Sequence, residues 1–161
     1  MEPMKVLFVC TGNICRSPTA ETVFRHRVAV LGIADRITAD SAGTSSEEHG
    51  NPTDRRARQA AAARGYALPD RRARRVAPAD FDTFDLILGM DRGHCADLRR
   101  IAPDHARDKI RLFMTYAAGA TVQDVPDPWY GGARDFDHAL DLIEAGVAGL
   151  IDSLAAGRAR P

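Results

Sequence analysis

The sequence has few cysteines, no long apolar run and no excess of charge of either sign. Three cysteines in 161 residues cannot all pair, which disfavours a disulfide scaffold and favours a reducing cytoplasm. The 22 basic residues balance 22 acidic ones, whereas bulk binding to nucleic acid or to a membrane surface usually needs a strong basic excess. No apolar segment approaches the length of a membrane span, and the first residues lack the apolar core of a signal peptide. We therefore expect a cytoplasmic protein with no membrane span and no nucleic-acid partner.

Metal-binding patterns are also missing. The chain has no Cys-x-x-Cys pair and no paired His/Cys clusters, so the sequence gives little support to a structural zinc site. What the chain does have is a hydrophobic fraction of 45% and enough length to bury a proper core. There is no internal repeat, no low-complexity block and no linker. These features predict one globular domain over residues 1–161.

Short apolar segments of strand type alternate with segments whose apolar residues recur at helical spacing. Ser17 suits the N-cap of the first helix, Pro18 its first position and Gly32 its end. Asp91 suits the N-cap of a later helix, and the last helix carries one continuous apolar stripe. We expect strands at residues 5–9, 36–41, 84–91 and 109–114, and helices at residues 18–31, 51–64, 92–101 and 136–154. This alternation predicts a single-domain α/β protein with a four-stranded parallel sheet, helices on both faces and the flavodoxin-like strand order 2-1-3-4.

The loop after the first strand carries the stretch VCTGNICRSP, residues 9–18. In parallel sheets of this kind, ligands bind outside the carboxyl ends of the strands, and this loop is a usual place. A loop from Thr11 to Arg16 that feeds directly into a helix can turn several backbone N–H groups inward and so bind an anion. Gly12 permits unusual backbone angles, Asn13 tolerates a left-handed one, and Arg16 can donate to two oxygens of a phosphate-like group. The stretch therefore predicts a phosphate-binding loop.

Cys10 stands at the start of this loop, where the same positive field favours its thiolate, the reactive form. Ser17 could donate a hydrogen bond to that sulfur. A thiolate beneath a bound tetrahedral oxyanion is positioned to attack it, which predicts phosphoryl transfer through a cysteinyl-phosphate. The alternative is a packing cysteine beside a solvated arginine, since Cys-x5-Arg alone is a short pattern. The preceding strand, the following helix and the continuation Arg-Ser-Pro favour the catalytic interpretation.

The motifs of the chain resemble those of the low-molecular-weight protein tyrosine phosphatases. VCTGNICRSP is similar to their phosphate-binding loop nearly letter for letter, and DSAGT, GNP, GMD and DPWYG follow in the family's order. The resemblance implies an enzyme that needs no metal or cofactor, acts on phosphotyrosine proteins and releases inorganic phosphate. It also implies the residues of the phosphate site: Cys10 as nucleophile, Arg16 as phosphate ligand and transition-state stabiliser, Ser17 as the aid to the leaving thiolate, Asn13 and Ser41 as braces, and Thr11, Gly12, Ile14 and Cys15 as the rest of the loop.

The resemblance further implies a general acid in the DPWYG motif, which here is Asp127. A departing phenolate leaves faster when it is protonated, and prolines on both sides stiffen the loop that would hold the carboxyl over the site. Trp129 and Tyr130 would then line the cleft and stack on an aromatic substrate. Taken alone, Asp-Pro is typical of a surface turn, and one of the two aromatic residues could instead be partly buried against the last helix. The Cys-x5-Arg loop favours the general acid.

Three departures or branch points qualify the resemblance. Glu47 and Glu48 occupy a loop in which many members carry an aromatic cleft wall, and Arg71 stands where many carry a histidine that joins the bracing network. Ile14 resembles the phosphotyrosine branch, since a phosphoarginine-specific branch has threonine there.

The resemblance also implies a redox role for Cys15. In relatives, the thiol at Cys15 captures an oxidised nucleophile as a disulfide. The alternative for this thiol is apolar packing.

Two other functions compete with the phosphatase. Thioredoxin-coupled arsenate reductases share the fold and the first loop but relay oxidation through further cysteines. The remaining thiol, Cys95, lies in a predicted helix, where packing is the simpler role. A non-catalytic phosphotyrosine-binding module is the second rival, and it would not need both Cys10 and Asp127. The arginine-rich segments 55–58 and 71–75 could attract acidic substrates or simply be solvated.

Overall fold

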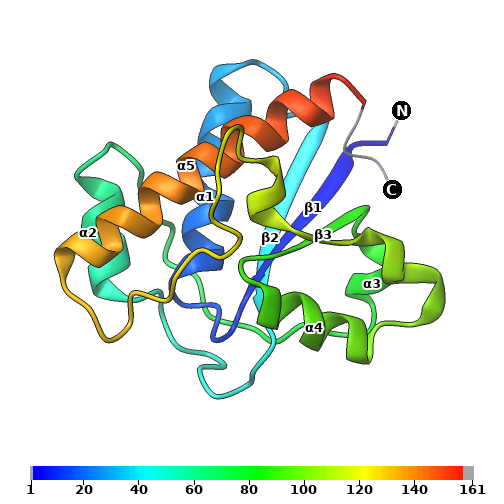
Figure 1. The fold of residues 1–161 in the computed structure, drawn as a ribbon, viewed down its shortest axis with the longest axis horizontal. Coiled ribbons are helices and arrows are strands. Elements are labelled where there is room, and N and C mark those ends of the chain that lie inside the picture. Colours follow the sequence, from blue (N-terminus) through cyan, green and yellow to red (C-terminus); the bar gives the residue numbers. More distant parts are fainter. Residues whose placement is uncertain (1, 158–161) are drawn as a thin grey trace.

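A four-stranded parallel sheet in the order β2-β1-β3-β4 forms the centre of the protein (Figure 1). The computed structural model describes residues 2–157. The strands are β1 (Met4–Cys10), β2 (Ile37–Gly43), β3 (Leu86–Gly89) and β4 (Ile110–Leu112), and every neighbouring pair is parallel. The predicted fold class and strand order are therefore confirmed.

β1 is buried on both faces of the sheet, which is why its sequence is a nearly continuous apolar run. Val6, Phe8 and Cys10 point into the core on one face, here called the first core. Leu7 and Val9 point into the core on the other face, the second core. The alternation along the strand thus sends the Cys10 side chain to the same side as Phe8.

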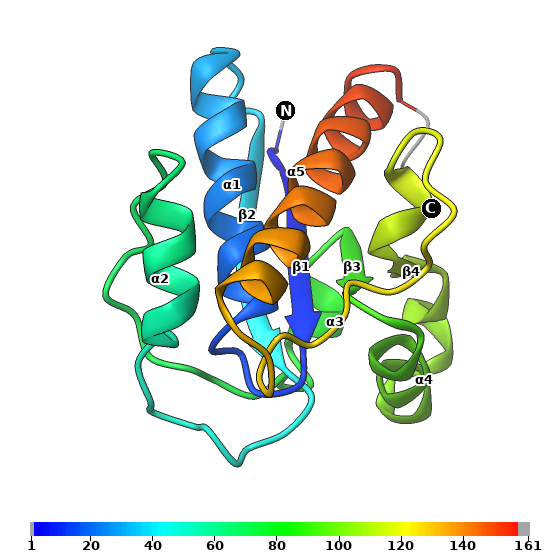
Figure 2. The same ribbon diagram turned by 60° about the vertical axis from the view of Figure 1, so that its left-hand side comes forward.

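Helices cover both faces of the sheet, with the sheet between them (Figure 2). α1 (Arg16–Val30) and α5 (Ala133–Ala155) enclose the first core, and α2 (Arg55–Ala62) packs against both of them. α4 (Arg92–Ile101) and the short α3 (Asp80–Thr83) enclose the second core. The two-sided arrangement is the one that the strand and helix alternation predicts.

α5 carries the apolar stripe that the sequence predicts. Its buried side chains along that stripe are Phe136, Leu140, Ile143, Val147 and Leu150. Leu140, Ile143, Val147 and Leu150 close the first core over the central strands. Within residues 2–157, no helix combines the length and the apolar character needed to cross a bilayer.

The start of α1 differs from the prediction. The helix begins at Arg16 with Cys15 at its N-cap, so the expected Ser17 cap and Pro18 start are wrong. The Ser17 hydroxyl lies instead among the side chains of the preceding loop, where it contacts Cys10. The local sequence pattern assigns this hydroxyl to a helix cap, but in the folded protein it contacts Cys10 instead.

Several other element ends differ: β2 extends to Gly43, β3 is shorter than predicted at both ends, and α5 begins at Ala133 rather than at residue 136. Two residues predicted at helix ends are confirmed. α2 begins later than predicted, because Asp54 accepts hydrogen bonds from two backbone N–H groups of the first turn and fixes its start at Arg55. β4 ends at Leu112, since residues 113–116 form a 3₁₀ turn. Gly32 follows α1 with a φ of 72°, the left-handed conformation expected of a helix stop. Asp91 caps α4 as predicted.

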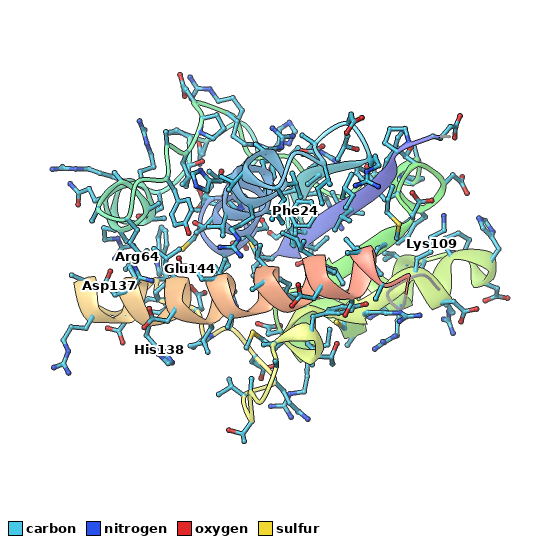
Figure 3. The ribbon with its side chains drawn as sticks, turned by 90° about the horizontal axis from the view of Figure 1, so that it is seen from above. Phe24, Arg64, Lys109, Asp137, His138 and Glu144 are labelled. Atoms are coloured by element: carbon cyan, nitrogen blue, oxygen red, sulfur yellow. The ribbon has the colours of Figure 1, made fainter. Side chains whose placement is uncertain are left out.

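Ion pairs fasten the end of α2 to α5. Arg64 donates to Glu144 and to the backbone oxygen of Asp137, the latter at 3.2 Å, and its Nη1 lies 2.8 Å from Asp141 Oδ1. The Tyr66 hydroxyl donates to Glu144 at 2.7 Å. Figure 3 labels Arg64, Asp137 and Glu144, which gather at one end of α5. α2 is therefore held firmly against the amino-terminal half of α5.

Candidate active site

Three segments meet beyond the carboxyl end of β1 and form a cleft of about 280 Å³. They are the loop after β1, the loop after β2 and the segment that leads into α5, which Figure 2 shows converging beyond the arrowhead of β1. The residues that line the cleft are Cys10, Thr11, Gly12, Ile14, Cys15, Arg16, Ser45, Glu47, Glu48, Asp127, Trp129 and Tyr130. Three further residues expected at the site, Asn13, Ser17 and Ser41, lie buried behind this lining.

Asn13 fixes the shape of the loop after β1. Its backbone takes the left-handed conformation, with a φ of 58°, whereas Gly12 does not. Its amide nitrogen donates to Ser17 Oγ at 2.9 Å and to Ser41 Oγ at 3.0 Å. Its amide oxygen accepts the backbone N–H of Arg74 at 3.0 Å. Because both donors and the oxygen are in use, the side chain has one satisfactory orientation.

Ser17 connects this network to the sulfur of Cys10. Its Oγ lies 3.0 Å from Cys10 Sγ. Asn13 already donates to Ser17, so the hydroxyl hydrogen is free to point away from the amide. The other acceptor in reach, the backbone oxygen of Ala42, is farther away at 3.4 Å. The Ser17 hydroxyl is therefore placed to donate a hydrogen bond to the Cys10 sulfur at the floor of the cleft.

A buried carboxylate extends the network behind the loop. Ser41 Oγ donates to Glu21 Oε1 at 2.7 Å, and Arg71 Nη1 donates to the same oxygen. Arg71 also donates to the backbone oxygen of Ser41 at 3.1 Å and pairs with Asp40 at 3.1 Å. Burial raises the pKa of Glu21, and the charge of Arg71 opposes that rise. Arg71 thus joins the network from the position at which many family members carry a histidine, while Glu21 is a member that the sequence analysis missed.

Arg16 reaches the cleft from the first turn of α1 and is almost entirely buried. Its Nη1 donates to Asp91 Oδ2 and to the backbone oxygen of Val125, each at 2.9 Å. Its Nη2 lies 3.6 Å from Asp127 Oδ2. The planar guanidinium is therefore oriented by protein groups on one edge while it remains part of the cleft wall.

His94 lies against Arg16 and Thr11 and was not predicted as a site residue. Only 3% of its surface is exposed. Its Nδ1 accepts the backbone N–H of Asp91 at 3.2 Å, so Nε2 carries the hydrogen and donates to Thr11 Oγ1 at 2.9 Å. Burial lowers the pKa of His94 to about 4, against the opposing charge of Asp91. Its position three residues after the Asp91 cap, where a capping-box partner sits, is the signal that could have revealed it.

The Asp127 segment is anchored at two points and open between them. Val125 and Pro128 are buried, whereas 52% of the Asp127 side chain is exposed. Asp127 Oδ1 accepts the backbone N–H of Trp129 at 3.0 Å, a local turn that holds the carboxyl near the backbone. Trp129 is 39% exposed and Tyr130 96% exposed, so neither is buried against α5. Asp-Pro does form a turn, and the turn presents its carboxyl to the cleft.

Glu47 and Glu48 line the same cleft as the aromatic residues. Glu48 accepts a hydrogen bond from Asn51 Nδ2 at 2.6 Å and packs over the loop after β1. A Cβ added at Gly12 would lie 3.0 Å from Glu48 Cγ, so a larger residue at this position would push the Glu48 side chain aside. The cleft therefore has two carboxylates on its rim in addition to Asp127.

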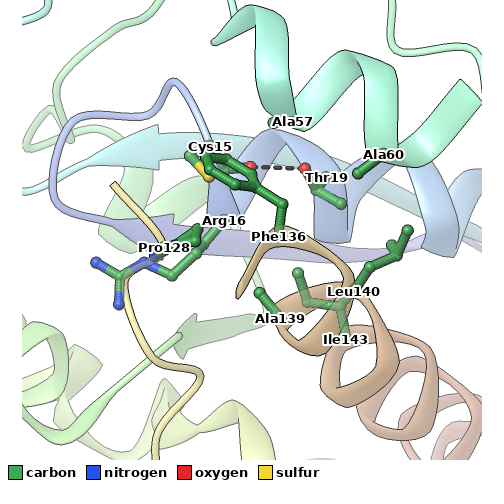
Figure 4. Close-up of a pocket in the computed structure, with 10 residues that line it drawn as sticks. All are labelled: Cys15, Arg16, Thr19, Ala57, Ala60, Pro128, Phe136, Ala139, Leu140 and Ile143. Carbon is green, nitrogen blue, oxygen red and sulfur yellow. Dashed lines mark hydrogen bonds between the residues drawn. The ribbon is translucent and has the colours of Figure 1, made fainter. Parts of the chain in front are cut away.

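Cys15 lines both the cleft and a small cavity of about 10 Å³ behind it, shown in Figure 4. Phe136 and Pro128 are among the other residues around this cavity. Burial raises the pKa of the Cys15 thiol, and the neighbouring Cys10 adds to the rise. Cys15 is therefore a neutral thiol in apolar surroundings.

Cys95 lies in the second core, on the face of the sheet opposite to Cys10. It packs so closely on β3 that a Cβ added at Gly89 would lie 2.6 Å from its sulfur. Cys95 does not line the cleft. Packing is thus its role, and the structure offers no relay of thiols from Cys10 through Cys95.

The fold and the cleft define an α/β protein in which the loop after β1 brings Cys10 and Arg16 into one cleft. Among residues 2–157, no three His, Cys, Asp or Glu side chains are grouped so that they could hold a metal ion. A family model, "Low molecular weight phosphotyrosine protein phosphatase", matches residues 5–160. The low molecular weight protein-tyrosine-phosphatase of Streptomyces coelicolor is 45% identical over 152 residues, which cover 91% of each chain.

Solved structures agree with the sequence comparisons. A protein tyrosine phosphatase from Entamoeba histolytica, solved with Hepes in its active site, superposes with a TM-score of 0.93 at 37% identity, over 96% of this chain and 99% of the other. YfkJ from Bacillus subtilis superposes with a TM-score of 0.92 at 35% identity, over 98% of each chain. The chain belongs to the low-molecular-weight protein tyrosine phosphatases, a family of enzymes.

Proposed function

We propose that the protein hydrolyses phosphotyrosine in phosphoproteins, and small aryl phosphates, through a cysteinyl-phosphate on Cys10. The observation that supports this most directly is the 3.0 Å contact between Ser17 Oγ and Cys10 Sγ at the floor of the cleft. Arg16 and Asp127 line the same cleft. The nucleophile, the phosphate ligand and the acid are thus within reach of one bound phosphate ester.

In the first step, the Cys10 thiolate attacks phosphorus and the bond from phosphorus to the phenolic oxygen breaks. Asp127 gives its proton to the departing phenolate, and Arg16 and the backbone N–H groups of the loop hold the equatorial oxygens. In the second step, water attacks phosphorus and gives a proton to Asp127, while the sulfur–phosphorus bond breaks. Inorganic phosphate is released, and Ser17 stabilises the leaving thiolate.

The test is Cys10→Ser, assayed with an aryl phosphate and with inorganic phosphate as a ligand. We expect turnover to be lost while phosphate binding stays within about threefold, because the loop N–H groups and Arg16 remain. Substantial turnover by Cys10→Ser would contradict the cysteinyl-phosphate mechanism. Ser17→Ala is the companion variant, and we expect it to slow phosphoenzyme hydrolysis without loss of phosphate affinity.

The cytoplasmic location and the extent of the catalytic domain, residues 1–161, are also proposals. The first is supported by the three cysteines, all within the described residues, none of which forms a disulfide. Fractionation of the native cell and immunodetection would test it. Activity of the chain expressed alone would test the second.

A further inference from the structure

Arg56, near the start of α2, contacts the backbone of the segment that carries Asp127. Its Nη1 donates to the backbone oxygen of Trp129 at 2.9 Å. Its guanidinium carbon lies 5.1 Å from the centre of the Trp129 ring and 4.8 Å from the centre of the Phe136 ring. Both distances are those of a cation stacked on an aromatic face. Arg56 therefore holds the segment by one hydrogen bond and two ring contacts.

The other edge of the same guanidinium is tied to the phosphate-binding loop. Arg56 Nε and Nη2 donate to the carboxylate of Asp54 at 3.3 and 3.1 Å. The backbone N–H of Asp54 in turn donates to the backbone oxygen of Ile14 at 2.7 Å. Although burial opposes it, hydrogen bonds from Arg56 lower the pKa of Asp54, so this carboxylate stays charged. A continuous path of contacts thus joins Ile14 to Trp129 through one arginine.

The peptide backbone of Trp129 is held from both sides. Its N–H is bonded to Asp127 Oδ1 at 3.0 Å, and its oxygen is bonded to Arg56. A shift of the Trp129 backbone would therefore also shift its N–H group, which orients the Asp127 carboxyl. α2 is a stable base for this contact, because Arg64 and Tyr66 fasten its far end to α5.

We infer that Arg56 is a positioning residue for the reaction: it holds the Asp127 carboxyl at a fixed place relative to the phosphate-binding loop. This inference rests on the proposed function, since it assumes that Asp127 is the general acid. Arg56 does not touch the reacting atoms and does not line the cleft. Its effect passes through Asp127, so its loss matters only where the substrate needs a proton.

The arginines beside Arg56 provide matched controls. Arg55 and Arg58 are exposed on the same helix, and neither is hydrogen-bonded or ion-paired to the Asp127 segment among the described residues. Had the run 55–58 served only to attract acidic substrates, its three arginines would contribute alike. The structure distinguishes them, because the guanidinium of Arg56 alone among the three is bonded to Trp129 and Asp54.

The test compares Arg56→Gln, Arg56→Lys and Arg58→Gln on aryl phosphates whose phenols differ in pKa. For a poor leaving group, we expect Arg56→Gln to lower kcat/KM by about 10- to 100-fold, part of the contribution of a general acid. For an activated phenol, we expect a change of about threefold or less. Inhibition by inorganic phosphate and activity of Arg58→Gln should stay near native values. Arg56→Lys should show most of the decrease in kcat/KM that Arg56→Gln shows for a poor leaving group, because an ammonium cannot replace the planar guanidinium.

Three outcomes would overturn the inference. The first two concern Arg56→Gln: an equal decrease in kcat/KM for all leaving groups, or no decrease for poor leaving groups. The third is full activity of Arg56→Lys. The double variant Asp127→Asn with Arg56→Gln provides a second measurement: beyond Asp127→Asn alone, it should lose nothing further for a poor leaving group. If Asp127→Asn itself shows no dependence on the leaving group, the proposed acid is wrong. If it shows one and Arg56→Gln does not, only the role of Arg56 is wrong.

Discussion

His94 Nε2 lies 2.9 Å from Thr11 Oγ1, which joins α4 to the lining of the cleft through one hydrogen bond. The imidazole is buried beside Arg16, and its Nδ1 accepts a backbone N–H, so the ring is held as a neutral donor. Burial disfavours a charged imidazole most strongly and Arg16 would repel it, while the Asp91 carboxylate, 3.2 Å from Nδ1, opposes these two effects. The fold therefore favours the neutral form of His94.

Stability toward acid should depend on His94. Its pKa falls from 6.5 to about 4 on folding. Its contribution to the free energy of unfolding is therefore complete above pH 6.5 and is lost as the pH falls from there through about 4. Since one pKa unit corresponds to about 1.4 kcal/mol, the free energy of unfolding should decrease by about 3 kcal/mol near pH 4 through this group. We expect the free energy of unfolding to fall less between pH 7 and pH 4 in His94→Gln, which keeps an acceptor and a donor but does not titrate. Urea unfolding at both pH values measures this, and parallel declines in the two proteins would contradict it.

Asp127→Asn should slow phosphoenzyme formation most for the substrates whose leaving group most needs protonation. With poor leaving groups we expect a loss of about 10²–10⁴-fold, and with activated phenols a much smaller one. Rapid-quench measurement of the phenol burst over a series of aryl phosphates provides the comparison. Equal losses over the series would show that Asp127 has another role.

Peroxide should inactivate the enzyme reversibly only when Cys15 is present. A Cys10 thiolate oxidises to sulfenic acid, which a nearby thiol can capture as a disulfide with loss of water. Cys15 lines the same cleft and its thiol is neutral. We expect a dithiol to restore most activity in the native protein and little in Cys15→Ala. Cys95→Ala is the control, and full recovery of peroxide-treated Cys15→Ala would rule out a protective role.

The acidic rim should favour phosphotyrosine with basic neighbours. Glu47 and Glu48 line the cleft, where their carboxylates should repel acidic flanks of a phosphopeptide and attract basic ones. We expect kcat/KM to be higher for Lys- or Arg-flanked peptides than for acidic ones, and the preference to weaken in Glu47→Gln. Glu47→Trp should lower KM, since a second aromatic wall adds about 0.5–1.5 kcal/mol of stacking. A peptide panel that shows no effect of flank charge would contradict this interpretation of the rim.

The parts of the site that could be predicted from sequence are those whose chemistry lies in one short segment. Cys10, Asn13 and Arg16 fall in one short stretch from the end of β1 to the start of α1, and the alternation of elements places that stretch at the carboxyl edge of the sheet. His94 and Arg56 could not be found in this way. Their partners Thr11 and Trp129 lie 83 and 73 positions away in the chain, so only the folded structure brings them together.

Ser17 shows why a local rule can fail at such a place. A Ser-Pro pair before an apolar stripe predicts a helix cap, and the prediction is wrong by two residues. The hydroxyl contacts Cys10 and Asn13 instead, at the cost of a cap that α1 does without. Helix preference is worth about 1 kcal/mol at a cap, which a buried hydrogen-bond network can outweigh.

The complete engagement of the Asn13 side chain has a consequence for molecular recognition. Its donors and its oxygen are bonded to Ser17, Ser41 and Arg74, so it has no donor to offer a ligand. Under the proposed function, the floor of the cleft meets the phosphate group that all phosphate esters share, and the Asn13 side chain adds no contact of its own to the rest of the ester. Discrimination among esters would then come from the rim, at residues such as Glu47 and Tyr130, whose side chains are exposed to solvent. Substitutions at the rim should therefore change substrate preference without altering the hydrogen bonds behind Cys10.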